Sequence, residues 1–193
     1  MGSQNCNRDP EIILQEALEA GITAFQYREK GAGALTGEAK IKLGERLRRL
    51  CSDYSIPFFV NDDVELVSKL AADGIHVGQD DVSVNELRTR FPDLLIGLSI
   101  SNNDELKQSP VELVDYVGAG PVYSTHTKED AKQAVGLPWI THLREHYPDL
   151  PIVGIGGINS TNAKQVLTAG ADGVAVISAI SKSTNIAQTI RAL

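Results

Sequence analysis

Polar side chains alternate along a short segment near the N-terminus. Residues 24–28 read Ala-Phe-Gln-Tyr-Arg, which predicts a strand, and Glu29 and Lys30 follow it. Since successive strand residues point to opposite faces, Gln26, Arg28 and Lys30 share one face and the aromatic residues share the other. Two cations on one face favour an anion-binding site. The alternative is a salt bridge between Arg28 and Glu29 at a solvated rim.

Carboxylates gather where two further predicted strands end. The strand at 57–60 runs into Asn-Asp-Asp, and the strand at 74–77 is followed by Gly-Gln-Asp-Asp. Acidic residues that end neighbouring strands lie close together, and close carboxylates repel unless they are protonated or bridged by a cation. A hard divalent ion shared with substrate phosphates is the usual solution. The pattern therefore predicts a Mg²⁺ site.

Helix capping is the competing explanation for these carboxylates. Asp62 with Glu65 fits a capping box, which would account for one aspartate of the group. After the next strand, Ser83 and Glu86 form the better box, so that the two aspartates before them are left free for another role.

Hydroxyl groups follow two later segments. Ser99 ends the strand predicted at 95–99, where its hydroxyl could donate to a phosphate or close a local turn. The loop at 120–136 is long for a compact domain, and such loops are usually functional. It contains Thr125-His126-Thr127-Lys128, a set of donors and one point charge that suits a phosphate.

The last two predicted strands carry the most specific signal. The strand at 151–154 is soon followed by Gly156 and Gly157, which allow close approach of a ligand to the backbone. The strand at 173–177 is followed by Ser178, which opens a short helix. Loops after barrel strands seven and eight, with the N-terminus of an extra helix, form a recurrent phosphate site.

Two histidines resemble a metal-binding motif. His142-Leu-Arg-Glu-His146 matches a metalloprotease pattern, but its predicted helix belongs to the outer ring and no further ligand is evident. We interpret these as helix-face histidines, and His76 as a hydrogen-bonded residue inside a strand.

Strands and helices must alternate to position these groups. After an opening helix at 10–20, the sequence predicts seven strand–helix repeats. The strands are predicted at 24–28, 57–60, 74–77, 95–99, 116–119, 151–154 and 173–177. The helices between and after them are predicted at 36–54, 64–71, 84–91, 103–108, 138–146, 161–168 and 185–193.

Strict alternation predicts a parallel sheet covered by helices, and the spacing favours a (β/α)₈ TIM barrel formed by residues 1–193 as a single domain. Seven strands are one short of eight. The chain opens with a helix, so we expect it to lack most of the first strand, with Met1–Ser3 as the tail of that strand. A doubly wound open sheet is the second choice.

Composition narrows the class of protein. The 193 residues are 42% hydrophobic and 22% charged, with a net charge of −7, which argues against a nucleic-acid partner. No apolar run approaches the ~20 residues that span a bilayer, and no signal peptide is recognisable. The two cysteines, Cys6 and Cys51, suit a reducing compartment. We expect a cytoplasmic enzyme without a membrane partner, and a homo-oligomer is compatible with the sequence.

Five motifs together carry a family resemblance. They are Gln-Tyr-Arg-Glu-Lys, Val-Asn-Asp-Asp, Gly-Ile-His-Val-Gly-Gln-Asp-Asp, Thr-His-Thr-Lys and Gly-Ile-Gly-Gly-Ile. In this order and spacing they resemble the thiamine phosphate synthases over essentially the whole chain. The resemblance implies a Mg²⁺-dependent transfer of a pyrimidine methyl group to a thiazole phosphate, with release of diphosphate.

The resemblance also implies roles for individual residues. Asp62 and Asp81 would hold Mg²⁺. The pyrimidine diphosphate would be bound by Gln26, Tyr27, Arg28, Glu29, Lys30, Asn61, Ser99 and Lys128, of which Arg28, Lys30, Ser99 and Lys128 are the catalytic set. The thiazole phosphate would be bound by Thr125, His126, Thr127, Gly157, Ile177 and Ser178.

Three other functions compete with this one. A thiazole tautomerase of the related barrel family would need neither Mg²⁺ nor a diphosphate site, and another phosphate-binding barrel isomerase gives no reason for paired carboxylates. The third is a non-catalytic phosphate-ligand-binding barrel, which an absent strand makes conceivable. Since the absent strand would leave unpaired backbone groups beside residues 24–28 and 173–177, we expect poor solubility or weak activity of this chain.

Overall fold

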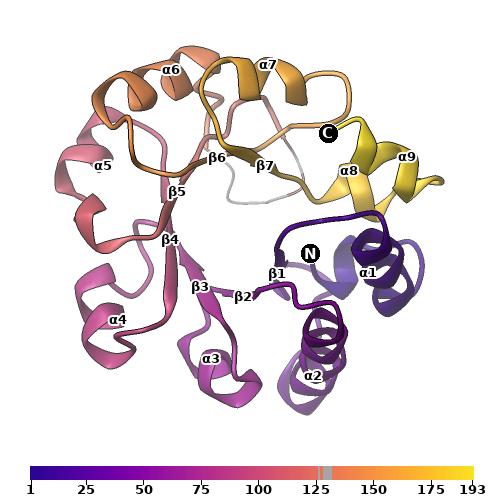
Figure 1. The fold of residues 1–193 in the computed structure, drawn as a ribbon. Helices are drawn as coiled ribbons and strands as arrows, with labels where there is room; N and C mark the ends of the chain where they lie inside the picture. Colours follow the sequence, from indigo (N-terminus) through magenta and orange to yellow (C-terminus); the bar gives the residue numbers. More distant parts are fainter. Residues whose placement is uncertain (126, 128–131) are drawn as a thin grey trace. The chain divides into compact units, whose positions relative to one another are not determined.

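The structure is a computed structural model that describes residues 1–125, 127 and 132–193. The chain divides into two compact units. The N-terminal unit comprises Met1–His76 and Ile177–Ala192, and the C-terminal unit comprises Val77–Val176 and Leu193. Strands and helices alternate along both, as the sequence predicted (Figure 1).

The N-terminal unit is built around parallel strands. Strand β1 pairs with β2 in the register Phe25↔Phe58, and β2 pairs with β3 in the register Phe59↔Gly74. Its strands are β1 (Phe25–Tyr27), β2 (Phe58–Asn61) and β3 (Gly74–Val77), the last of which crosses the boundary between the units. Its helices are η1 (Ser3–Asn5), α1 (Pro10–Glu19), α2 (Gly37–Asp53), α3 (Val64–Leu70), α8 (Ser178–Ser181) and α9 (Ile186–Arg191).

Met1 lies beside β1 like the neighbouring residue of a parallel strand. Its amino group donates to the Gln26 carbonyl at 2.6 Å, and the Arg28 N–H donates to the Met1 carbonyl at 3.1 Å. This is the slanted bonding of a parallel ladder. The expectation of unpaired backbone groups along this strand is therefore wrong for Gln26 and Arg28.

The apolar face of α1 forms part of the core. Asp9 caps the helix by accepting from the Glu11 N–H at 2.8 Å, and Pro10 occupies the first helical position, where its missing N–H costs nothing. Ile13 and Ala17 pack with Ile186 of α9. Sequence segments at the two ends of the chain thus share one cluster, in which Met1, Cys6, Ile22, Ile180 and Ile190 also take part.

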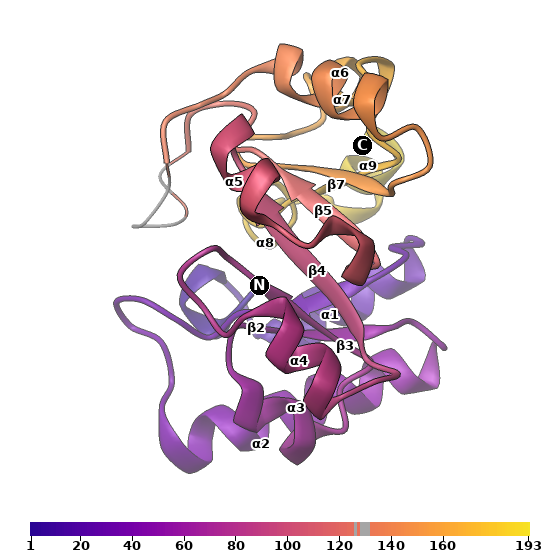
Figure 2. The same cartoon turned by 90° about the vertical axis from the view of Figure 1, so that its left-hand side faces the viewer.

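The C-terminal unit holds four parallel strands in chain order. Figure 2 shows β4 and β5 side by side, with Gly97 paired to Tyr116, and β6 follows with Ile152 paired to Val117. Its strands are β4 (Leu95–Ile100), β5 (Tyr116–Ala119), β6 (Ile152–Ile155) and β7 (Gly173–Ala175). Its helices are α4 (Val84–Arg90), α5 (Asn103–Gln108), η2 (Val111–Leu113), α6 (Leu137–His146) and α7 (Ala163–Thr168).

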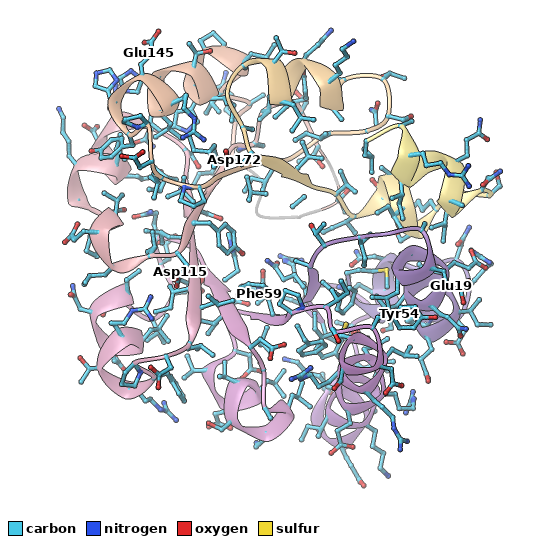
Figure 3. The ribbon with its side chains drawn as sticks, viewed as in Figure 1. Glu19, Tyr54, Phe59, Asp115, Glu145 and Asp172 are labelled. Carbon is cyan, nitrogen blue, oxygen red and sulfur yellow. The ribbon has the colours of Figure 1, made fainter. Side chains whose placement is uncertain are left out.

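An arginine–aspartate arrangement recurs at the starts of alternate strands. In each case an aspartate just before one strand accepts from an N–H in the first two residues of the preceding strand and pairs with an arginine from a helix. The three sets are Arg48–Asp73–Phe58, Arg88–Asp115–Ile96 and Arg144–Asp172–Ile152. Figure 3 labels Asp115 and Asp172. The sequence analysis did not predict this repeat.

Predicted and observed elements agree closely. The described residues contain all seven predicted strands, and each end lies within two residues of its prediction. The strand predicted at 173–177 stops at Ala175, because Ile177 already has the helical dihedrals (φ −115°, ψ −77°) of the residue that precedes α8. Among the described helices, we find none with the length and apolar character needed to span a membrane.

Candidate functional site

A charged pocket opens at the carboxyl ends of β1 and β2. It has a volume of about 310 Å³ and lies within the N-terminal unit. Its lining combines residues after both strands with residues from the adjacent helices: Tyr27, Glu29, Lys30, Lys40, Asn61, Asp62, Asp63 and Leu66. Five of the predicted site residues therefore meet here, namely Tyr27, Glu29, Lys30, Asn61 and Asp62.

Two lysine–aspartate ion pairs face this pocket. The Lys30 ammonium pairs with Asp62 Oδ2, and Lys40 of α2 pairs with Asp63 Oδ2 at 2.8 Å. The sequence analysis did not single out Lys40. It lies in the first turn of a helix, and only tertiary packing brings that turn to the end of β2.

Asp62 does not cap a helix. The cap of α3 is Asp63, whose Oδ1 accepts from the Leu66 N–H at 3.2 Å, so the capping box proposed for Asp62 and Glu65 is wrong. Asp62 instead has a left-handed backbone (φ 50°), and its N–H donates to the His76 carbonyl at 2.9 Å. A non-glycine residue in this region costs about 1–2 kcal/mol. The strain is of the kind that recurs at functional sites.

Asp63 is held ionised by its neighbours. Burial alone would raise the pKa of its carboxyl group, but the Lys40 ammonium and the N–H groups of Leu66 and Glu65 outweigh burial and lower it. Both carboxylate oxygens of Asp63 are thus committed to local structure.

The aromatic face of β1 packs on helix α2. Tyr27 is buried, and its hydroxyl donates to the Lys40 carbonyl at 2.8 Å. Burial raises the pKa of the Tyr27 phenol. Phe25 is buried as well, while Gln26 on the opposite face is half-buried and Arg28 is buried. Tyr27 therefore meets the pocket with its buried ring and fixes the start of α2.

Glu29 is buried and anchors two backbone segments. Its carboxylate accepts from the Ser3 N–H at 2.8 Å, from the Ser3 hydroxyl and from the Leu35 N–H at 2.8 Å. The Gln4 amide donates to the carbonyls of Arg28 and Lys30. The N-terminal segment thereby fixes the backbone that carries the two predicted cations. Contact of Glu29 with a substrate stays a prediction.

The Ser3→Ala variant is expected to lower the free energy of unfolding by about 1.5 kcal/mol, because it removes a donor to a buried carboxylate. Urea unfolding followed by circular dichroism measures this. Ser52→Ala, on the exposed face of α2, is the control and should be neutral or slightly stabilising. Equal stability of the two variants would contradict the anchoring role of Glu29.

Asp81 and Ser99 belong to the C-terminal unit. Asp81 Oδ2 accepts from the Gly78 N–H at 2.7 Å, and Ser83 caps α4 through the Glu86 N–H, as predicted. The Gln79 amide donates to the Ser99 carbonyl at 2.8 Å. Asp81 is therefore free of capping duty, as the sequence indicated, and its proximity to Asp62 stays a prediction.

The phosphate-loop prediction falls partly on residues that the structure describes. The Thr127 N–H donates to Thr125 Oγ1 at 3.3 Å, while His126 and Lys128 lie outside the described residues. Gly157 has φ 67°, and a Cβ there would lie 2.7 Å from the Ser124 carbonyl oxygen. Only glycine fits this close approach of two loops.

Ser178 is the first residue of α8, which confirms the predicted short helix, and Ile177 directly precedes it. Both lie in the N-terminal unit, whereas Gly157 lies in the other unit. A phosphate site that joins these three residues stays a prediction.

The histidines of α6 form a surface stack. The rings of His142 and His146 lie 4.2 Å apart, and Trp139 stacks on His142 at 5.4 Å. His146 Nδ1 is 2.8 Å from the His142 carbonyl oxygen. In the part of the chain that the structure describes, no group of three or more histidine, cysteine or acidic residues is arranged to hold a metal. The stacked rings agree with the interpretation of His142 and His146 as helix-face histidines.

The pocket residues fit a hard divalent cation that is completed by other ligands. Asp62 supplies carboxylate oxygens, and its side chain is 16% exposed at the pocket wall. Protein-bound Mg²⁺ commonly takes one or two carboxylates and completes its shell with water and phosphate oxygens. Asp62 matches this chemistry because it caps no helix, whereas Asp63 is the cap of α3.

Parallel strands alternating with helices, and a charged pocket at the strand ends, define an α/β protein with a ligand site in the usual barrel position. The sequence pattern of the thiamine monophosphate synthase family matches residues 1–180. The chain belongs to this family.

Individual relatives agree over nearly the whole chain. The thiamine-phosphate synthase of Oceanobacillus iheyensis is 59% identical over all of this chain and 94% of its own length. That of Staphylococcus saprophyticus is 54% identical over 98% of this chain and 90% of its own length.

A solved structure confirms the fold class. The thiamine phosphate pyrophosphorylase of Pyrococcus furiosus is 32% identical, with a TM-score of 0.85 over 98% of this chain and 89% of its own. This likeness confirms the predicted TIM-type α/β barrel, with seven strands rather than eight in the described residues.

Proposed function

We propose that the chain catalyses the last joining step of thiamine monophosphate synthesis. It condenses 4-amino-2-methyl-5-hydroxymethylpyrimidine diphosphate with 4-methyl-5-(2-phosphoethyl)thiazole or its carboxylated form, and releases diphosphate. Family membership supports this function. The observation that carries the substrate assignment is the pocket that brings Lys30 and Asn61 together with Asp62, since a diphosphate needs cations and a metal-binding carboxylate.

The proposed reaction is dissociative. The C–O bond to the diphosphate breaks first and leaves a pyrimidine methylene cation stabilised by its ring; the thiazole nitrogen then forms the new C–N bond. The protein needs no nucleophile for this reaction. Arg28, Lys30, Ser99 and Lys128 stabilise the negative charge that grows on the leaving group, and the walls of the site align the two partners.

Mg²⁺ is the proposed cofactor, held by Asp62 and Asp81, and when bound it neutralises charge on the diphosphate. Asn61 and Gln26 orient the pyrimidine diphosphate. On the thiazole side, Thr125, His126, Thr127, Gly157, Ile177 and Ser178 are proposed to bind the phosphate. We also propose a cytoplasmic location, supported by the free thiols of Cys6 and Cys51.

The pocket favours this reaction over the tautomerase alternative. An isomerase that acts on a thiazole phosphate gives no reason for a lysine and a strained aspartate at the ends of β1 and β2. Family membership over residues 1–180 argues against a non-catalytic binding barrel, and turnover decides between the two.

A turnover assay with both substrates tests the proposal. Thiamine phosphate and diphosphate are measured by chromatography, with and without Mg²⁺. We expect both products in equal amounts, and only with the metal. Folded protein that makes no thiamine phosphate but isomerises the thiazole substrate would overturn the synthase assignment in favour of the tautomerase.

A further inference from the structure

Both carboxylate oxygens of Asp62 already accept hydrogen bonds from the protein. The Lys30 ammonium occupies Oδ2, and the Asn61 amide donates to Oδ1. The ammonium group neutralises this carboxylate and competes strongly with a divalent cation for it. The carboxylate that is suited to bind the metal therefore carries a resident counterion.

We propose that Lys30 is an exchangeable counterion, which keeps free divalent cations off Asp62 until a diphosphate arrives to accept the ammonium group. This inference rests on the proposed function and deepens it, because it makes metal binding at that site depend on the diphosphate. Metal and diphosphate bind together, since the diphosphate releases Asp62 while it binds Lys30. By linkage, each then tightens the binding of the other.

The neighbouring ion pair differs from Lys30–Asp62 in its capping role. Asp63 Oδ1 caps α3 while Oδ2 pairs with Lys40, whose side chain is 22% exposed. Lys30 is 49% exposed on a segment that follows β1, and Asp62 caps no helix. Lys30 is therefore the more exposed of the two ammonium groups, and its ion pair with Asp62 opens without involving a helix-cap residue.

Binding of Mn²⁺ alone to the full chain tests the proposal, with bound metal read by electron paramagnetic resonance and no substrate present. We expect Lys30→Met to bind Mn²⁺ at least tenfold more tightly than the parent chain. Lys30→Arg keeps the positive charge and should bind as weakly as the parent. Adding Asp62→Asn to Lys30→Met should abolish the gain, which locates the metal at Asp62.

Lys42→Met is the matched charge control. Lys42 lies on α2, its side chain is 62% exposed, and it pairs with Glu38 away from the pocket. The Lys42→Met variant removes the same charge as Lys30→Met and should leave the Mn²⁺ affinity unchanged. Unchanged affinity in Lys30→Met, or an equal gain in Lys42→Met, would overturn the proposal. Thermal unfolding of each variant shows that it is folded.

The two proposals fail separately. Thiamine phosphate synthesis by the parent chain, together with unchanged Mn²⁺ affinity in Lys30→Met, would refute the counterion role and leave the function standing. A tenfold gain in a chain that makes no thiamine phosphate would support the counterion role and refute the function.

Discussion

The Asp62→Asn variant is expected to lose at least about a hundredfold in kcat/KM for thiamine phosphate formation. The substitution preserves size but removes the negative charge from the carboxylate that we propose as a metal ligand. Loss of a supporting contact to a ligand already costs ~10–100-fold, and loss of the ligand itself should cost more. Steady-state kinetics at saturating Mg²⁺ measure the effect, and it should fall on kcat as well as on KM.

Glu65→Gln is the control for this prediction. It removes one carboxylate from α3, where Glu65 is 79% exposed and pairs only weakly with Lys69 at i+4. We expect activity close to that of the parent. Asp62→Asn with nearly full activity, in a chain whose Glu65→Gln variant behaves the same, would remove Asp62 from the mechanism.

The residues of the pocket that follow strands could be predicted from the sequence. Glu29 and Lys30 come just after β1, Asn61 and Asp62 lie at the end of β2, and parallel strands collect such residues at one edge. The competing explanation of Asp62 as a helix cap was wrong by a single position. The strand ends at Asn61 rather than at residue 60, so the cap moves from Asp62 to Asp63.

Contacts between distant segments could not be predicted in this way. Lys40 and Ser3 have no pattern that sets them apart from surface residues. Lys40 reaches Asp63 only because α2 packs beside β2, and Ser3 reaches Glu29 only because the N-terminal segment lies along β1. Such partners depend on tertiary packing rather than on local periodicity.

The repeated arginine–aspartate sets are hidden for the same reason. Arg144 and Asp172 lie 28 positions apart, and each alone is typical of a solvated helix or turn. In the structure the aspartate fixes the start of one strand, and the arginine donates hydrogen bonds to carbonyls of the loops around it. The three sets occur at every second strand, which indicates that they set strand starts rather than take part in chemistry.

The Arg144→Met variant is expected to lower the free energy of unfolding by about 3 kcal/mol, which corresponds to a Tm lower by roughly 6–12 °C. Arg144 donates to the carbonyls of Gly170, Pro148 and Leu150 and pairs with Asp172. Methionine fills similar volume but leaves these acceptors without their donor. Scanning calorimetry and urea unfolding measure the loss.

Two further variants separate the hydrogen bonds from the charge. Arg144→Lys keeps the charge but lacks the planar guanidinium group that donates to several carbonyls at once. It should therefore recover only part of the stability. Lys164→Met removes an exposed cation from α7 of the same unit and should change the free energy of unfolding by less than about 0.5 kcal/mol. If Arg144→Met were no less stable than Lys164→Met, the carbonyls around Arg144 would be satisfied by solvent. The Arg144–Asp172 set would then be a surface ion pair of little weight, and Asp172 would fix the start of β6 without help from Arg144.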